Sequence, residues 1–178
     1  MSATLQQVVN LARIGFKGPN AAAWLGEQGI PLPERANSWC VTGDDEQDIC
    51  VRLGASEFLL ERGDGNALRK LQAEIAAHIP GVYPVLREDC AFVIAGDAAD
   101  DVLAQMCNVN FAALRAEARE AVMTLMIGVA VTVVPQGNAA QRRYRLWCDP
   151  TFGDYVWSSL NEVAGPYLID TKSPGGAR

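Results

Sequence analysis

The feature that most constrains the fold of this chain is a repeated unit in which an apolar strand, a glycine and an amphipathic helix follow one another. The first copy reads RIGFKGPNAAAWL (Arg13 to Leu25), and the second lies within CAFVIAGDAADDVLAQM (Cys90 to Met106). The matching positions are Gly18, Ala21 and Leu25 in the first copy and Gly96, Ala99 and Leu103 in the second. This self-similarity predicts two halves built on one plan, with glycine allowing a tight backbone turn before each helix.

The spacing of apolar residues predicts the elements of the first half. They are a strand at 13–17, a helix from 19, strands at 39–41, 49–53 and 57–61, a helix at 66–78 and a strand at 82–87. Pro84 in the last of these strands cannot donate a ladder hydrogen bond, which places that strand at a sheet edge. This order of elements is typical of a ferredoxin-like unit.

The second half follows the same reasoning. It has a predicted strand at 91–95, a helix at 97–106, two strands within 122–134 that bend at Gly128, a strand at 143–148 and a final helix. Asp149 and Pro150 suit the first positions of that helix, where a carboxylate caps free N–H groups and proline loses no bond. The 122–134 run is shorter than the about 20 residues of a membrane helix, so it is interpreted as buried sheet.

We therefore predict an α+β fold of two ferredoxin-like halves, which are pseudo-duplicated antiparallel sheets backed by helices. The expected boundaries are residues 1–88 for the first half and 89–169 for the second, with one shared core and a disordered tail at 170–178. The length of 178 residues is sufficient for such a core.

Composition narrows the class of function. The net charge of -6 argues against nucleic-acid binding, which needs a basic surface. The five cysteines include no C-x-x-C pair, which is typical of reduced thiols in a cytoplasmic protein, and the N-terminus has no signal-peptide pattern. We expect a cytoplasmic protein with no membrane partner.

No catalytic set is visible. His78 is the only histidine, so a two-histidine metal site cannot form and a histidine-assisted nucleophile is disfavoured. Asp48, at the end of the acidic GDDEQD segment, is a weak catalytic candidate, because carboxylates crowded in a turn are usually solvated. Candidates for a partner interface are the aromatic and basic residues near the last strand and helix: Trp147, Trp157, Arg143 and Arg145.

An ordered series of segments carries a family resemblance. RIGFKGPNAAAWL, IPLPERAN, LGASEFLLE, LAQMCNVNF and RRYRLWCDPTFGDYVWSSLNEVAG together resemble the gamma subunit of bacterial heterotetrameric sarcosine oxidase. That family is related to the folate-binding fold of aminomethyltransferases, so the resemblance implies a folate-binding-domain-like architecture. Of the acidic pair that aminomethyltransferases carry before a strand, only Asp48 has a match here, beside Gln47.

The resemblance implies a non-catalytic structural subunit in a bacterial complex of sarcosine catabolism and one-carbon metabolism. The complex converts sarcosine, O2 and tetrahydrofolate into glycine, H2O2 and methylenetetrahydrofolate. No cofactor is expected in this chain, while FMN, FAD, NAD, zinc and tetrahydrofolate belong to partner subunits. The implied partners are alpha, beta and delta subunits, with beta contacted most directly, and the isolated chain could form a homo-oligomer.

Two alternatives stay open at this stage: a stand-alone folate-binding protein, and an aminomethyltransferase-like one-carbon transferase. The transferase requires a pocket between the two halves with a carboxylate such as Asp48 pointing into it. Folate binding without catalysis predicts a shift of the thermal unfolding temperature when folates are added.

Overall fold

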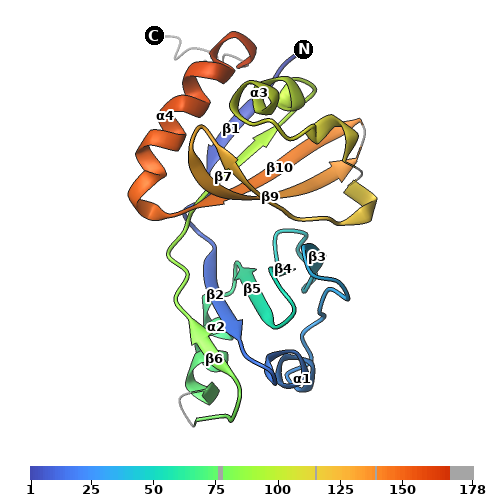
Figure 1. Cartoon of the computed structure of the whole chain (residues 1–178), viewed down its shortest axis with the longest axis vertical. Helices are drawn as coiled ribbons and strands as arrows, with labels where there is room; N and C mark the ends of the chain where they lie inside the picture. Colours follow the sequence, from blue (N-terminus) through green and yellow to red (C-terminus); the bar gives the residue numbers. More distant parts are fainter. Residues whose placement is uncertain (76–77, 115, 139, 169–178) are drawn as a thin grey trace, which may run out of the picture.

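The computed structural model describes residues 1–75, 78–114, 116–138 and 140–168. These residues form two antiparallel sheets of five strands each, and helices cover the outer face of each sheet (Figure 1). The layers are therefore helix, sheet, sheet, helix, which confirms the predicted α+β class. The predicted disordered tail at 170–178 lies outside the described residues.

The first sheet has the strand order β3-β4-β5-β2-β6. Its elements along the chain are β2 (Ala12–Lys17), α1 (Ala21–Glu27), β3 (Ser38–Val41), β4 (Ile49–Arg52), β5 (Glu57–Arg62), α2 (Gly65–Ile75) and β6 (Tyr83–Val85). The short β6 contains Pro84 and lies at the edge, as predicted.

The second sheet has the order β1-β7-β10-β9-β8. Its elements are β1 (Thr4–Gln7), β7 (Cys90–Ala95), α3 (Ala99–Met106), β8 (Val122–Met126), β9 (Val129–Asn138), β10 (Gln141–Cys148) and α4 (Gly153–Ala164). The bend at Gly128 is confirmed, with φ of +83° between β8 and β9. The Asp149 carboxylate accepts a hydrogen bond from the N–H of Thr151, so the predicted cap is present in the short 3₁₀ turn that leads into α4.

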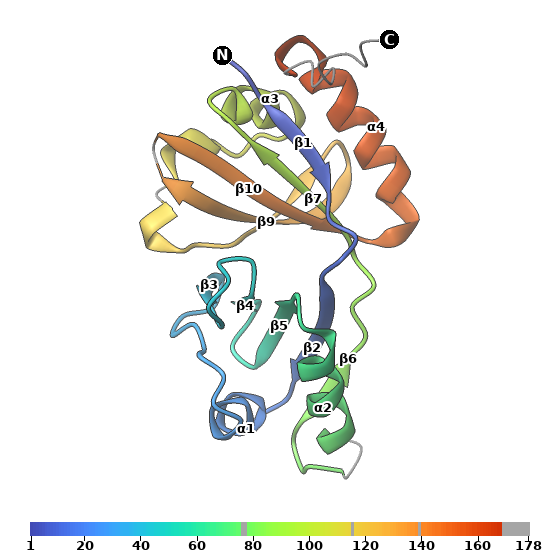
Figure 2. The same cartoon turned by 180° about the vertical axis from the view of Figure 1, so that it is seen from behind.

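The two sheets match strand for strand when they are read outward from β2 and β7. Each of these strands pairs antiparallel with the strand before the last helix of its half, β5 or β10. On its other side β2 pairs with β6, whereas β7 pairs with β1, which comes from the N-terminus (Figure 2). The predicted segment 1–88 thus contributes one strand to the other sheet, and the sequence analysis did not predict that strand.

The two glycines of the repeat are needed because another part of the backbone passes against each of them. Gly18 has φ of +128°, and a Cβ there would lie 2.2 Å from the carbonyl oxygen of Gly81. Gly96 has φ of +117°, and its Cβ would lie 2.4 Å from the carbonyl oxygen of Ser2. Residues with a Cβ rarely adopt either conformation. The repeat predicted from the sequence therefore corresponds to the same backbone turn in both halves.

Apolar residues form three layers of core. One lies between the second sheet and helices α3 and α4, and another lies between the first sheet and helices α1 and α2. The third layer joins the inner faces of the two sheets and contains Trp39, Ile49, Val51, Leu59, Ala91, Ala121, Val134 and Trp147. Because this third layer is continuous, the two halves share a core.

Candidate functional site

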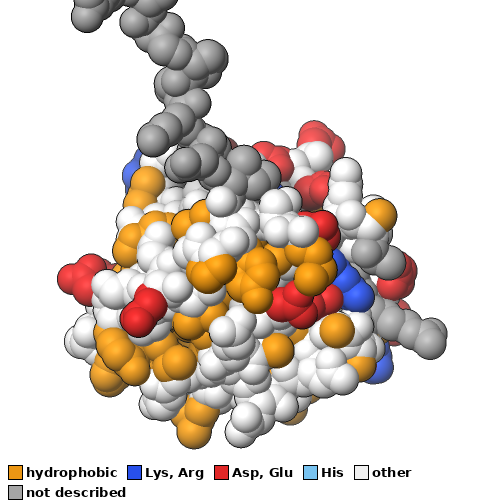
Figure 3. Space-filling model, turned by 90° about the horizontal axis from the view of Figure 1, so that it is seen from above, with side chains coloured by type: hydrophobic (Ala, Val, Ile, Leu, Met, Phe, Trp, Pro, Cys, Tyr) orange, Lys and Arg blue, Asp and Glu red, His pale blue; other side chains and the backbone are white. Residues whose placement is uncertain are grey.

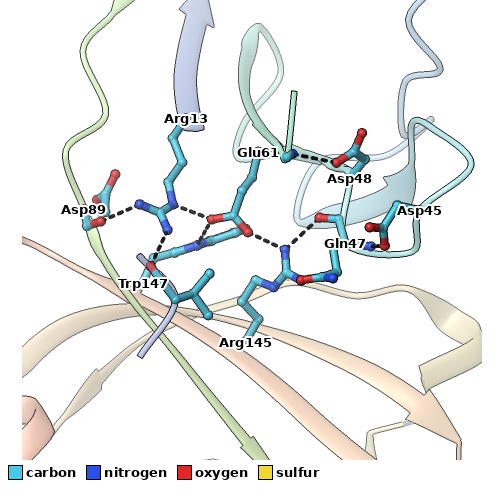
Figure 4. Close-up of polar contacts among 10 residues, drawn as sticks. Arg13, Asp45, Gln47, Asp48, Glu61, Asp89, Arg145 and Trp147 are labelled. Carbon is cyan, nitrogen blue, oxygen red and sulfur yellow. Dashed lines mark hydrogen bonds and ion pairs between the residues drawn. The ribbon is translucent and has the colours of Figure 1, made fainter. Parts of the chain in front are cut away.

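A buried polar cluster lies in the layer between the two sheets (Figure 4). Glu61 of β5 is fully buried, and its carboxylate accepts hydrogen bonds from Arg145 and Trp147 of β10 and from Arg13 of β2. The Trp147 Nε1 to Glu61 Oε2 distance is 2.9 Å. One carboxylate therefore connects the two sheets through a charged and an aromatic side chain.

Both arginines of the cluster also hold backbone carbonyl groups. Arg145 Nη1 donates to the carbonyl of Gln47 at 2.9 Å, and Arg13 Nη1 donates to the carbonyl of Asp89 at 2.8 Å. Burial lowers the pKa of Arg145, and the neighbouring Glu61 carboxylate opposes that shift. Charges removed from water are tolerated only when they are paired in this way, so removal of Glu61 would leave uncompensated positive charge.

A groove opens beside this cluster, at the mouth of the inter-sheet layer, with a volume of about 700 Å³. Its walls are the loop before β4, the ends of β1 and β7, and the beginning of β10, and the side chains of Gln6, Gln136, Arg142, Arg143 and Arg145 line it. A second hollow of about 390 Å³ shares Glu46, Gln136, Gly137 and Gln141 with the groove and reaches Trp39. Each of the two is within the size range of small-molecule sites.

Three buried polar atoms at this groove have no hydrogen-bond partner among the described residues. They are Arg145 Nε, Gln136 Oε1 and Trp39 Nε1. Arg145 is fully buried, and both Gln136 and Trp39 are 8% exposed. Buried polar groups are normally paired, so this set could accept a small polar ligand with both donor and acceptor atoms.

The structure places the predicted site residues differently. Arg143 lines the groove. Trp157 stacks on Phe92 with ring centroids 5.6 Å apart and is half-buried on α4. Trp147 and Arg145 are 2% and 0% exposed and contact Glu61 inside this chain. Both side chains thus bond inside the chain, while Arg145 also lines this groove and Trp147 lines a shallower groove near β8, so their predicted place at a partner interface stays a prediction.

Asp48 lies beside the groove and does not line it. Its Oδ1 accepts a hydrogen bond from the N–H of Gly63 at 2.9 Å, so the carboxylate ties the loop before β4 to the end of β5. The neighbouring residues 45–47 line the groove in its place. The geometry gives Asp48 a structural bond within the chain, and its weak candidacy as a catalytic residue stays a prediction.

Sequence reasoning missed Glu61 and Arg13, the two charged residues at the centre of the layer. Each lies at the end of a predicted strand, where charge usually marks solvent exposure. The pairing of the two strands could have revealed them. Arg13 and Glu61 lie opposite each other in the antiparallel pair β2–β5, so their side chains share one face of the sheet.

The described residues contain no group of three or more His, Cys, Asp or Glu side chains placed to hold a metal ion. Among the same residues, every helix is too short or too polar to cross a membrane.

Comparison with known proteins gives the fold. No protein-family model matches the sequence, and a search of curated proteins found no match. A chain in the structure of heterotetrameric sarcosine oxidase from Corynebacterium sp. U-96, in complex with pyrrole 2-carboxylate, superposes with a TM-score of 0.71 at 20% identity. The match covers 98% of this chain and 88% of that chain.

The glycine cleavage system aminomethyltransferase T from Bartonella henselae also superposes with a TM-score of 0.71, at 15% identity. The match covers 94% of this chain and 47% of that one, so this chain spans about half the length of the aminomethyltransferase. This chain has the aminomethyltransferase-like, folate-binding fold. The predicted fold resemblance is thereby confirmed.

Proposed function

We propose that this chain is a non-catalytic, gamma-type subunit of a flavin-dependent heterotetrameric sarcosine oxidase. The observation that carries the proposal is the nearly end-to-end structural match with one chain of such an oxidase, at 98% and 88% coverage. The aminomethyltransferase, by contrast, is about twice as long. The coverage of both chains therefore favours the oxidase chain over the aminomethyltransferase as the counterpart.

The centre of the molecule supports a structural role. Glu61, Arg145 and Trp147 fill the space between the sheets with bonds inside the chain. In the proposed complex, sarcosine oxidation and the FMN, FAD, NAD, zinc and tetrahydrofolate sites belong to alpha, beta and delta subunits in the cytoplasm. The beta subunit is the proposed direct partner.

Co-expression of the other subunits with and without this chain tests the proposal. We expect sarcosine-dependent H2O2 formation from the full set, loss of assembled oxidase when this chain is omitted, and no oxidation by this chain alone. Full assembly and activity without the chain would contradict the proposal.

A second candidate function, a stand-alone folate-binding protein or an aminomethyltransferase-like one-carbon transferase, is favoured by the groove and its unpartnered polar atoms. Thermal unfolding with and without tetrahydrofolate tests folate binding, with Gln136→Leu as the groove variant. A rise in Tm that this substitution removes would support binding, and no rise would oppose both versions. Transfer of a one-carbon unit from an aminomethyl donor would then distinguish the transferase.

A further inference from the structure

The edge strands of the two sheets differ in how they are protected. An edge strand presents unpaired N–H and C=O groups, and proteins limit unwanted pairing there with short strands, proline, charge or a covering segment. β6 has three residues and contains Pro84, and β1 is short and polar with the sequence TLQQ. These two edges carry their own protection.

The edge of β3 is covered by another part of the chain. Trp39 N–H donates to the carbonyl of Arg119 at 2.9 Å, and Ala121 N–H donates to the carbonyl of Asn37 at 2.9 Å. Ser38 also forms an isolated antiparallel bridge with Glu120. Residues 119–121 thus act as a cover for this edge.

β8 has no such protection. In the described part of the chain it pairs only with β9, and its sequence VMTLM has no charged residue and no proline. Met123 and Leu125 are 53% and 66% exposed and point to the same face of the strand. An apolar edge of five residues with strong β-propensity would aggregate if it stayed uncovered.

The surroundings of β8 indicate the kind of partner that covers it. A shallow groove of about 490 Å³ runs from Met123 and Leu125 across β9 to Trp147, and carboxylates line its far end at Asp89 and Asp149. Asp89 Oδ2 is buried and has no hydrogen-bond partner among the described residues. A second copy of this chain carries a net charge of -6, so it matches this acidic rim less well than a basic segment does.

We infer that β8 is a docking edge for an extended apolar segment of a different protein chain, flanked by lysine or arginine residues. The partner strand pairs with the free backbone edge of β8, and its side chains cover Met123 and Leu125. Basic residues in the chain that flanks the paired strand cross the groove over β9 and neutralise Asp89 and Asp149. This inference rests on the proposed function, since it places the contact with a partner subunit at β8.

The helical layer formed by α3 and α4 does not present a free backbone edge next to exposed apolar side chains among the described residues. Seen from above, the upper end of the molecule shows several groups of hydrophobic side chains, with acidic side chains beside some of them (Figure 3). Strand addition needs a free backbone edge beside an apolar face, and β8 supplies both.

The test compares Leu125→Lys with Leu86→Lys in the tagged chain co-expressed with the other oxidase subunits. Leu86 is 75% exposed and lies between β6 and β7, so its substitution is a matched control for charge and exposure. We expect the wild type and Leu86→Lys to recover the partner equally. The Leu125→Lys chain should recover at least tenfold less of the partner subunit than the wild type does. Its Tm, measured on the isolated chain, should be unchanged. Amides of residues 122–126 should exchange at least tenfold more slowly in the complex.

The outcomes separate the two proposals. Equal recovery by Leu125→Lys would overturn the docking edge and leave the proposed function standing. If the wild type recovers no subunit, the proposed function fails, and a synthetic peptide KVTVTVK then tests the edge alone. Protection of the β8 amides by the peptide, lost in Leu125→Lys, would support the edge, and no protection would overturn it.

Discussion

The two sheets are copies in outline and differ at the positions that carry the argument for function. Both place the repeat glycine against a passing backbone, at Gly18 and Gly96. The register aligns the pair Arg13–Glu61 of the first sheet with Ala91–Trp147 of the second. One copy thus supplies a buried charged pair and the other supplies the aromatic N–H that bonds to it.

The edges diverge as well. Residues 119–121 cover the edge of β3, while the corresponding strand β8 is paired only with β9 among the described residues. The two halves keep the same backbone geometry at Gly18 and Gly96 because each turn brings a helix back onto the sheet of its half. The inter-sheet layer and the sheet edges are where the copies changed, so the specific functions of this chain are expected there.

The largest predicted effect comes from breaking the charged pair in the first copy. Glu61→Ala leaves Arg145 and Arg13 buried without their carboxylate, and we expect the free energy of unfolding to fall by about 3–5 kcal/mol. The control is Glu57→Ala, whose half-exposed carboxylate pairs with Arg87 and should change stability by less than about 1 kcal/mol. Urea unfolding measures both, and equal small losses would contradict the role of the cluster.

The next effect tests whether the two glycine turns are equivalent. Gly18→Ala and Gly96→Ala each force a side chain into a positive φ and against a carbonyl oxygen, and each should lose at least about 1–3 kcal/mol. Gly29 has φ of +71°, and a Cβ there would meet no atom within 4 Å. Gly29→Ala therefore reports the strain of the positive φ without a steric clash, and it should lower the free energy of unfolding by less. Gly96→Ala should also accelerate amide exchange in β1, and a variant as stable as wild type would refute the shared requirement.

The next prediction concerns how stability depends on pH through Tyr144, which lies in the core between the second sheet and helices α3 and α4. Burial, and then the hydrogen bond to Asp100, raise the pKa of Tyr144. A raised pKa keeps the stabilising effect complete below the unfolded value of about 10, and this stabilisation is lost as pH rises above it. Tyr144→Phe should therefore remove part of the alkaline loss of stability. Identical pH profiles of stability for the wild type and Tyr144→Phe would contradict this assignment.

The smallest effect concerns the helix that follows each glycine. Gly26 in α1 has open space around its Cβ, and the residue at the same spacing in α3 is Ala104. Gly26→Ala should stabilise the chain by about 0.5–1 kcal/mol, because alanine loses less backbone entropy in a helix. Ala104→Gly should lower stability by a similar amount in thermal unfolding. A loss of stability in Gly26→Ala would show that the two helices are not equivalent.

Sequence reasoning succeeded where the signal is local. The repeat glycines, the bend at Gly128 and the cap at Asp149 follow from the needs of a few neighbouring residues. It failed for β1, because TLQQ is short and polar and becomes a strand only by pairing with β7, far along the chain. It also failed for Glu61, because burial of that carboxylate depends on the distant residues Arg145 and Trp147.

The most direct test of the central claim is affinity purification of the tagged chain from its native host grown on sarcosine, followed by native mass spectrometry and a flavin absorption spectrum. We predict a complex of fixed stoichiometry that contains this chain, a flavoprotein, a large dinucleotide-binding subunit and a small zinc protein. Recovery of the chain alone, without flavin and with a measurable affinity for tetrahydrofolate, would contradict the subunit assignment.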